Sequence, residues 1–181
     1  MKTKRLSIIS IFAAIIVVLQ IVATYINFGG FPITLTLIPI IVAGAIYGPT
    51  VGLILGLIFG AIVNIMVITG ADPSGAVMLA IHPIITILTC FIKGGLAGLF
   101  GATAYKMIKN NKVGIIASAI ITPITNTATL YIALILFFES SFAAMVAAFM
   151  SINFIIELLI NVIIAPGLLV LVNRVKSREI Q

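Results

Sequence analysis

Long apolar runs separated by short polar breaks organise the whole chain. A helix that crosses about 30 Å of hydrocarbon needs about 20 residues. The pattern predicts six transmembrane helices, over residues 6–25, 34–47, 50–69, 77–108, 113–137 and 143–172. We therefore expect an all-α integral membrane protein in which residues 1–181 form a single six-span membrane domain. The first run is longer than the apolar core of a signal peptide, so we expect it to be the first span.

Charged residues mark the ends of these runs. All but one of the ten Lys and Arg residues lie near the N-terminus, in the segment 106–112 or near the C-terminus. Asp72 and Glu139 lie in breaks that contain no basic residue. Because positive charge accumulates in cytoplasmic loops, both termini and the 109–112 turn are predicted to be cytoplasmic, and the acidic breaks to lie outside. An even number of spans agrees with this placement.

The composition argues against a soluble domain and against a nucleic-acid-binding protein. The chain is 62% hydrophobic and 8% charged, whereas a soluble domain is about 45–50% apolar and about 25% charged. The basic residues behind the net charge of +6 flank the predicted spans. They are better explained by membrane topology and contact with anionic lipid headgroups than by nucleic-acid binding. The single cysteine, Cys90, cannot form a disulfide within one chain.

A stripe of small residues runs along the third predicted helix. Gly52, Gly56, Gly60 and Asn64 recur at intervals of four. Such a stripe predicts close packing of two membrane helices. Asn64, at its end, could instead reach a cavity.

Polar residues recur on single faces of the last three predicted helices. A polar face on a membrane helix must contact protein or water. His82, Thr86, Thr89 and Lys93 share one face by their spacing, and Asn153, Glu157 and Asn161 share another. Between them, a third face carries Thr122, Thr125, Asn126 and Thr129, with Tyr131 further outward. Together these faces predict a polar cavity open to the outside, and the candidate substrate-binding residues are Lys93, Asn126, Thr89, Asn153, His82, Thr86, Glu157, Tyr131 and Asn64.

Structural explanations compete with binding at several of these positions. Lys93 and Glu157 could form an intramembrane ion pair, and a threonine in a membrane helix often bonds to its own backbone. His82 could be an interfacial histidine. In the first outer loop, Asn27, Phe28 and Phe31 could be interfacial anchors or a gating loop over the cavity.

No enzyme motif is visible. The chain has no nucleophile elbow, no zinc-protease motif and no phosphate-binding loop. We therefore expect no catalytic residue, no metal site and no cofactor, and a binding subunit that needs partners.

Three features resemble the substrate-binding S-components of energy-coupling factor (ECF) transporters, which import vitamins into bacteria. Residues 28–39 (FGGFPITLTLIP), followed by Gly48-Pro49 and Gly52, resemble the first outer loop and second span of that family. The stripe of Gly52, Gly56 and Gly60 follows as it does there. In the first span, Ser10, Ala13 and Ala14 resemble its small-residue docking element, with Ser10 where the family usually has alanine. The size and the six predicted spans extend the resemblance over the whole chain.

The resemblance implies a multi-pass protein of the bacterial cell membrane. It would bind one vitamin from outside and dock through Ser10, Ala13 and Ala14 on a transmembrane scaffold subunit carried by two ATPase subunits. The loop and second span are most similar to the pantothenate-type branch. Lys93 would then pair with the carboxylate of pantothenate, and Asn126, Asn153 and Thr89 would bond its hydroxyl and amide groups.

The sequence is also compatible with other functions. The ligand could be another vitamin, of the pyridoxine type, a thiamine precursor, folate or riboflavin. A small scaffold protein of cell-wall assembly would also have a docking stripe and basic cytoplasmic ends, but it needs no converging polar faces. An independent small-solute carrier would work without partner subunits or ATP.

Overall fold

The protein is described from a computed structural model, which covers residues 2–25, 27–28, 31–32 and 35–179. Its elements in chain order are α1 (Lys2–Tyr25), β1 (Asn27–Phe28), β2 (Phe31–Pro32), α2 (Leu37–Tyr47), α3 (Pro49–Thr69), α4 (Pro73–Ile81), α5 (Pro83–Met107), α6 (Asn111–Phe137) and α7 (Ser140–Glu179). The two short strands pair antiparallel, with Asn27 opposite Pro32 and Phe28 opposite Phe31. The prediction of an all-helical membrane protein is thus confirmed, apart from this small hairpin.

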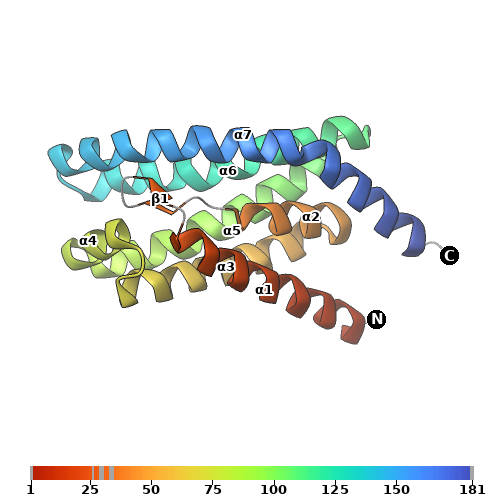
Figure 1. Cartoon of the computed structure of the whole chain (residues 1–181), viewed down its shortest axis with the longest axis horizontal. Helices are drawn as coiled ribbons and strands as arrows, with labels where there is room; N and C mark the ends of the chain where they lie inside the picture. The colour runs from red at the N-terminus through yellow and green to blue at the C-terminus, as the bar shows by residue number, and fades with distance from the viewer. Residues whose placement is uncertain (1, 26, 29–30, 33–34, 180–181) are drawn as a thin grey trace.

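Five of the described helices are long and apolar enough to cross a membrane, namely α1, α3, α5, α6 and α7. The predicted second span is shorter: α2 has 11 residues, which reach about 16 Å. It is apolar on all sides, and most of its residues are buried against the other helices. A helix that is hydrophobic all round belongs in a protein interior, and α2 accordingly lies among the longer helices (Figure 1).

The single helix predicted over residues 77–108 is wrong, because the chain breaks at His82. Here α4 ends and α5 begins, with Pro83 at the first position of the new helix. Proline has no N–H to donate and disfavours helical geometry in the residue before it. His82 accordingly adopts φ −137° and ψ 81°. The break makes α4 a separate short helix beside the start of α5.

The last helix is longer than expected. The sequence predicted a span over 143–172 with a bent or interfacial first portion, whereas α7 is helical from Ser140 to Glu179. Figure 1 shows its C-terminal part inclined to the rest. Pro166 lies inside the helix, and an internal proline is the usual cause of such a bend.

The prediction that the glycine stripe packs helices is confirmed at the interface of α3 and α5. A methyl group on Gly52 would overlap the carbonyl of Gly98, and one on Gly56 would overlap the carbonyl of Gly94. The reverse holds for methyl groups on Gly94 and Gly98. The two backbones are therefore in direct contact, which only glycine permits.

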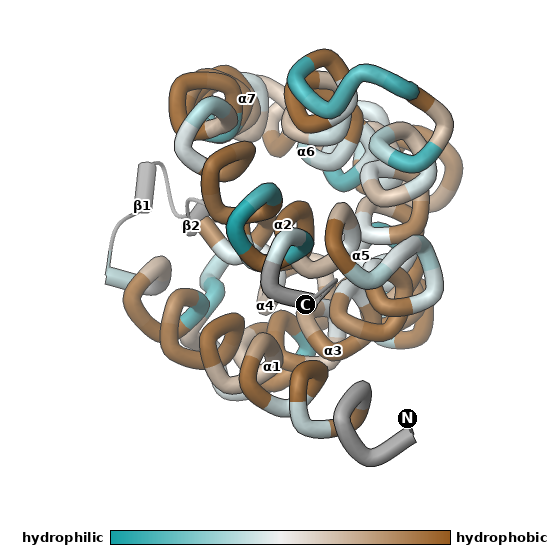
Figure 2. Tube along the Cα trace, turned by 90° about the vertical axis from the view of Figure 1, so that its right-hand side faces the viewer, coloured by the Kyte–Doolittle hydropathy of each residue, from teal (hydrophilic) through white to brown (hydrophobic). Residues whose placement is uncertain are grey.

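Both termini and the start of α6 lie at one end of the molecule, whereas α4 and the α6–α7 connection lie at the other (Figure 1). Figure 2 looks onto the end with the termini. It shows hydrophilic stretches near α6 and near the C-terminus, against largely hydrophobic outer helices. The three basic segments of the sequence thus lie at the same end of the molecule, which we call the basic end.

Candidate functional site

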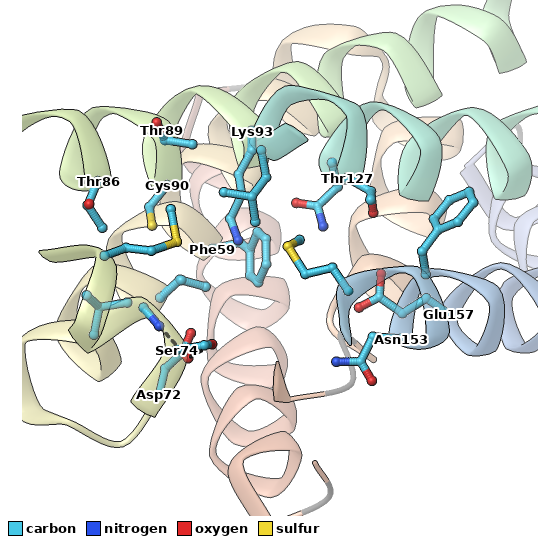
Figure 3. A pocket seen from close by; sticks show the side chains of 18 of the residues that line it. Phe59, Asp72, Ser74, Thr86, Thr89, Cys90, Lys93, Thr127, Asn153 and Glu157 are labelled. Carbon is cyan, nitrogen blue, oxygen red and sulfur yellow. Dashed lines mark hydrogen bonds between the residues drawn. The ribbon is translucent and has the colours of Figure 1, made fainter. Parts of the chain in front are cut away.

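A cavity of about 70 Å³ lies in the half of the molecule away from the basic end, between α1, α3, α4, α5, α6 and α7 (Figure 3). We call it the central cavity. Its polar lining residues are Gln20, Asp72, Ser74, Thr86, Thr89, Cys90, Lys93, Asn126, Thr127, Asn153 and Glu157. Its large apolar lining residues are Phe59, Val63, Val67, Met78, Leu130, Met150 and Phe154.

Helix α5 contributes the cation of the central cavity. Thr86, Thr89 and Lys93 line it together, as their spacing predicted. The two threonines are buried, and Thr86 donates its hydroxyl hydrogen to the carbonyl of His82 at 2.9 Å. Lys93 is half-buried and extends into the cavity from α5 (Figure 3). An ammonium held at this depth attracts anionic groups more strongly than one in water.

Helices α6 and α7 contribute amides and a carboxylate. Asn126, Asn153 and Glu157 are all buried, with exposed fractions of about 5–6%. Figure 3 shows Asn153 and Glu157 projecting from α7 on the side of the cavity opposite Thr86 and Thr89. The Oδ1 atom of Asn126 has no hydrogen-bond partner within the described residues. A buried amide oxygen normally has one, so this atom is available to a ligand.

Asp72 lines the cavity because of the turn before α4. Gly70 ends α3 in the left-handed conformation, with φ 77°. Asp72 then caps α4: its Oδ1 accepts hydrogen bonds from the Gly75 N–H at 3.0 Å and from the Ser74 hydroxyl at 2.7 Å. This cap positions the carboxylate beside the cavity.

Several lining residues were not predicted from the sequence. Asp72 and Ser74 were assigned only to a turn, although an aspartate before Pro73 is a typical start of a helix. Gln20 is buried and accepts a hydrogen bond from the Thr36 hydroxyl at 3.1 Å. A lone glutamine inside an apolar span was a signal available in the sequence. Phe59 and Thr127 had no such signal, because only packing decides which way they face.

The described lining of the central cavity has more carboxyl groups than ammonium groups. Among the described residues, it contains two carboxyl groups, of Asp72 and Glu157, and one ammonium group, of Lys93. A ligand with one carboxylate and several hydrogen-bond donors suits this set, because the carboxylate can meet Lys93 while the donors meet acceptor oxygens.

Three predicted candidates lie outside this lining. Asn64 is buried beside α5 and donates to the Ile87 carbonyl at 3.2 Å. Tyr131 bonds to the Ala147 carbonyl and the Ser151 hydroxyl, both at 2.9 Å. His82 is exposed at the helix break, with its ring edge-on to Phe138 at 5.2 Å.

Thr125 and Thr129 of α6 hydrogen-bond to the backbone of their own helix, which is the structural explanation considered for threonines in membrane helices. The hydroxyl of Thr125 donates to the Ile121 carbonyl and that of Thr129 to the Thr125 carbonyl, each at 2.8 Å.

The predicted docking residues do not share one face. Ser10 and Ala14 are exposed, whereas Ala13 packs against the core formed by α2 and α3.

The hairpin of the predicted gating loop lies, by its backbone, against α1 and α7. The side chains of Asn27, Phe28 and Phe31 are outside the described part of the structure.

Comparison with known proteins gives two findings. The profile of a family described as "ECF transporter, substrate-specific component" matches residues 4–169. The chain is also 28% identical, over 193 aligned positions, to the pantothenic acid transporter PanT of Lactococcus lactis subsp. cremoris (strain MG1363), and the alignment covers 98% of both proteins.

The family match spans most of the chain, and it agrees with the long apolar helices. Proteins of this family are components of transporters rather than enzymes. The chain belongs to the substrate-specific components of ECF transporters, and it is a multi-pass protein of the bacterial plasma membrane.

Proposed function

We propose that this chain captures pantothenate from outside the cell and delivers it to an ATP-driven energy-coupling module. One observation carries the proposal: the described lining of the central cavity has one ammonium, that of Lys93, and its other polar groups are mainly hydrogen-bond acceptors and amides. Pantothenate has one carboxylate, two hydroxyl groups and an amide. The similarity to a pantothenic acid transporter supports the same ligand.

Each group of the ligand has a proposed partner. Lys93 pairs with the carboxylate, and Asn126 and Asn153 bond the amide and a hydroxyl. Thr86 and Thr89 form the α5 wall. Glu157 accepts a hydroxyl hydrogen. Each such bond contributes about 1 kcal/mol, and a charge-assisted one contributes more.

Side chains must move to admit the vitamin. Ligand-binding cavities usually measure about 300–1,000 Å³, several times the 70 Å³ enclosed here. Met78 and Met150 line the cavity and also belong to an apolar cluster between α4, α6 and α7. Methionine side chains are flexible, so these two are the ones that we expect to make room.

The proposed topology is six spans in one membrane domain of residues 1–181, with both termini cytoplasmic. The basic end then faces the cytoplasm, as the positive-inside rule requires. The central cavity lies in the opposite half, open to the outside. In this arrangement α2 counts as a short, buried span.

The proposed partners are the transmembrane scaffold subunit and two ATPase subunits of an ECF transporter. Ser10 and Ala14 are exposed four residues apart on α1, so they form the docking face, with Ala13 supporting it from inside. ATP hydrolysis takes place in the partner subunits.

The first test is calorimetry of the purified protein against pantothenate, with Lys93→Met as the variant. We expect saturable one-to-one binding, and a loss of at least about 30-fold in affinity in the variant, because an unpaired buried carboxylate is costly. Lys112→Met, an exposed lysine outside the cavity, is the matched control. Equal affinity of Lys93→Met and wild type would contradict the proposed anion site.

The two carboxyl groups of the lining favour a second candidate, a cationic vitamin such as a thiamine precursor or a pyridoxine-type ligand. Asp72→Asn discriminates between the two, because it removes one negative charge and keeps an acceptor for the α4 cap. Tighter pantothenate binding in this variant would support the anion. Binding of a cationic vitamin that is weakened by Asp72→Asn would favour the alternative.

A further inference from the structure

A second cavity, of about 500 Å³, lies at the basic end of the molecule. It is formed where α2 and α5 end, where α6 begins, and beside the last turns of α7. Among the residues that the structure describes, none lines both this cavity and the central cavity. Its polar side chains are Tyr105, Lys106, Lys109, Asn111 and Lys176, together with Tyr47. We call it the basic cavity.

One wall of the basic cavity is held by contacts between three helices. The Lys176 ammonium of α7 donates to the Tyr105 hydroxyl of α5 at 3.2 Å and lies 4.6 Å from the centre of its ring. That hydroxyl donates in turn to Asn111 Oδ1 of α6 at 3.2 Å. Tyr105 is buried. The ammonium is therefore held in one place, and it retains two further hydrogens for another acceptor.

The electrostatic potential of this cavity is positive. Lys106, Lys109 and Lys176 line it, and its described lining includes no carboxylate. The C-terminal ends of α2 and α5 contribute about half a negative charge each. Three full positive charges exceed that sum, and the N-terminus of α6 adds to them. An anion would relieve the repulsion among the three ammonium groups.

We propose that the basic cavity binds a phosphate group, supplied by the headgroup of an anionic phospholipid or by a free phosphate. Basic pockets between membrane helices on the cytoplasmic side suit such headgroups. Membrane topology alone requires positive charge near the interface. It does not require an ammonium fixed on a buried tyrosine beside a cavity of this size, and this difference favours a binding site.

The test compares short-chain phosphatidylglycerol and phosphatidylcholine added to the detergent-purified full chain, with bound lipid counted by native mass spectrometry. Lys106→Gln/Lys109→Gln removes two cavity charges. Lys112→Gln/Arg174→Gln removes the same charge from exposed positions outside the lining. We expect wild type and the control to retain phosphatidylglycerol in preference to phosphatidylcholine, and the cavity variant to bind it at least tenfold more weakly.

Two results would overturn the proposal: an equal loss in the cavity variant and the control, or no preference for the anionic lipid together with no binding of phosphate. Inorganic phosphate, titrated by calorimetry, separates the two sources. If phosphate binding depends on Lys106 and Lys109 while no lipid preference is found, the result would support the basic cavity as a site for a soluble phosphate. Vitamin binding, measured on the same preparations, depends on the central cavity and reports separately on the proposed function.

Discussion

Helix α5 borders two regions that are built in opposite ways. On one side, Gly94 and Gly98 bring its backbone against that of α3. On the other side, Thr86, Thr89 and Lys93 face the central cavity with α6 and α7. Small residues let helices touch, whereas long polar residues keep space between them. One helix thus anchors a rigid interface and also forms one wall of the candidate binding cavity.

The largest expected effect comes from breaking the rigid interface. Gly56→Ala places a methyl group against the Gly94 carbonyl, and a backbone cannot yield as a side chain can. We expect a loss of about 3 kcal/mol in the free energy of unfolding, measured as a lower thermal transition in detergent. Gly167→Ala is the matched control, because a methyl group there meets no atom of the described residues within 4 Å. Similar transitions in the two variants would contradict close packing of α3 and α5.

The second prediction separates the two regions by function, using one buried asparagine in each. Asn126→Ala removes a cavity amide, so pantothenate affinity should fall about tenfold. Asn64 bonds to the Ile87 carbonyl beside the α3–α5 interface, so Asn64→Ala should lower the thermal transition and leave affinity unchanged. Calorimetry and thermal unfolding on both variants test this. Equal affinities would remove Asn126 from the site.

The third prediction concerns the cap that brings a carboxylate to the cavity. Asp72→Ala removes the acceptor for the Gly75 N–H and should cost about 1 kcal/mol in unfolding free energy. Asp72→Asn keeps an acceptor and should be close to wild type. Chemical denaturation in detergent measures both. A loss of equal size in the two variants would mean that charge, rather than capping, stabilises α4.

The smallest effect is expected where a buried hydroxyl has no partner. Ser118 is fully buried, and its Oγ has no hydrogen bond within the described structure. Ser118→Ala should change the unfolding free energy by less than about 0.5 kcal/mol, or raise it. Thr36→Val is the contrast, because it leaves the buried Gln20 oxygen without its donor and should cost about 1 kcal/mol or more. A large loss of unfolding free energy in Ser118→Ala would instead indicate a polar contact between α5 and α6.

Much of the lining of the central cavity could be predicted from the periodicity of polar residues. Lys93, Thr86 and Thr89 share a face at intervals of four and three, and Asn153 and Glu157 at four, so any helix through them presents them together. Tyr131 and His82 lie outside the described lining for different reasons. Tyr131 finds local partners across the α6–α7 interface, and His82 lies at a helix break that turns it outward.

The apolar runs of the sequence, by themselves, determined a helical membrane protein, because a backbone in hydrocarbon must satisfy its own hydrogen bonds. The glycine spacing determined where two helices touch. Only the tertiary structure decided that Asp72 and Gln20 join the lining, that Ala13 faces inward, and that Lys176 meets Tyr105 across 71 positions of the chain. These contacts depend on how whole helices are placed relative to each other, and that placement comes from packing over the entire bundle rather than from local pattern.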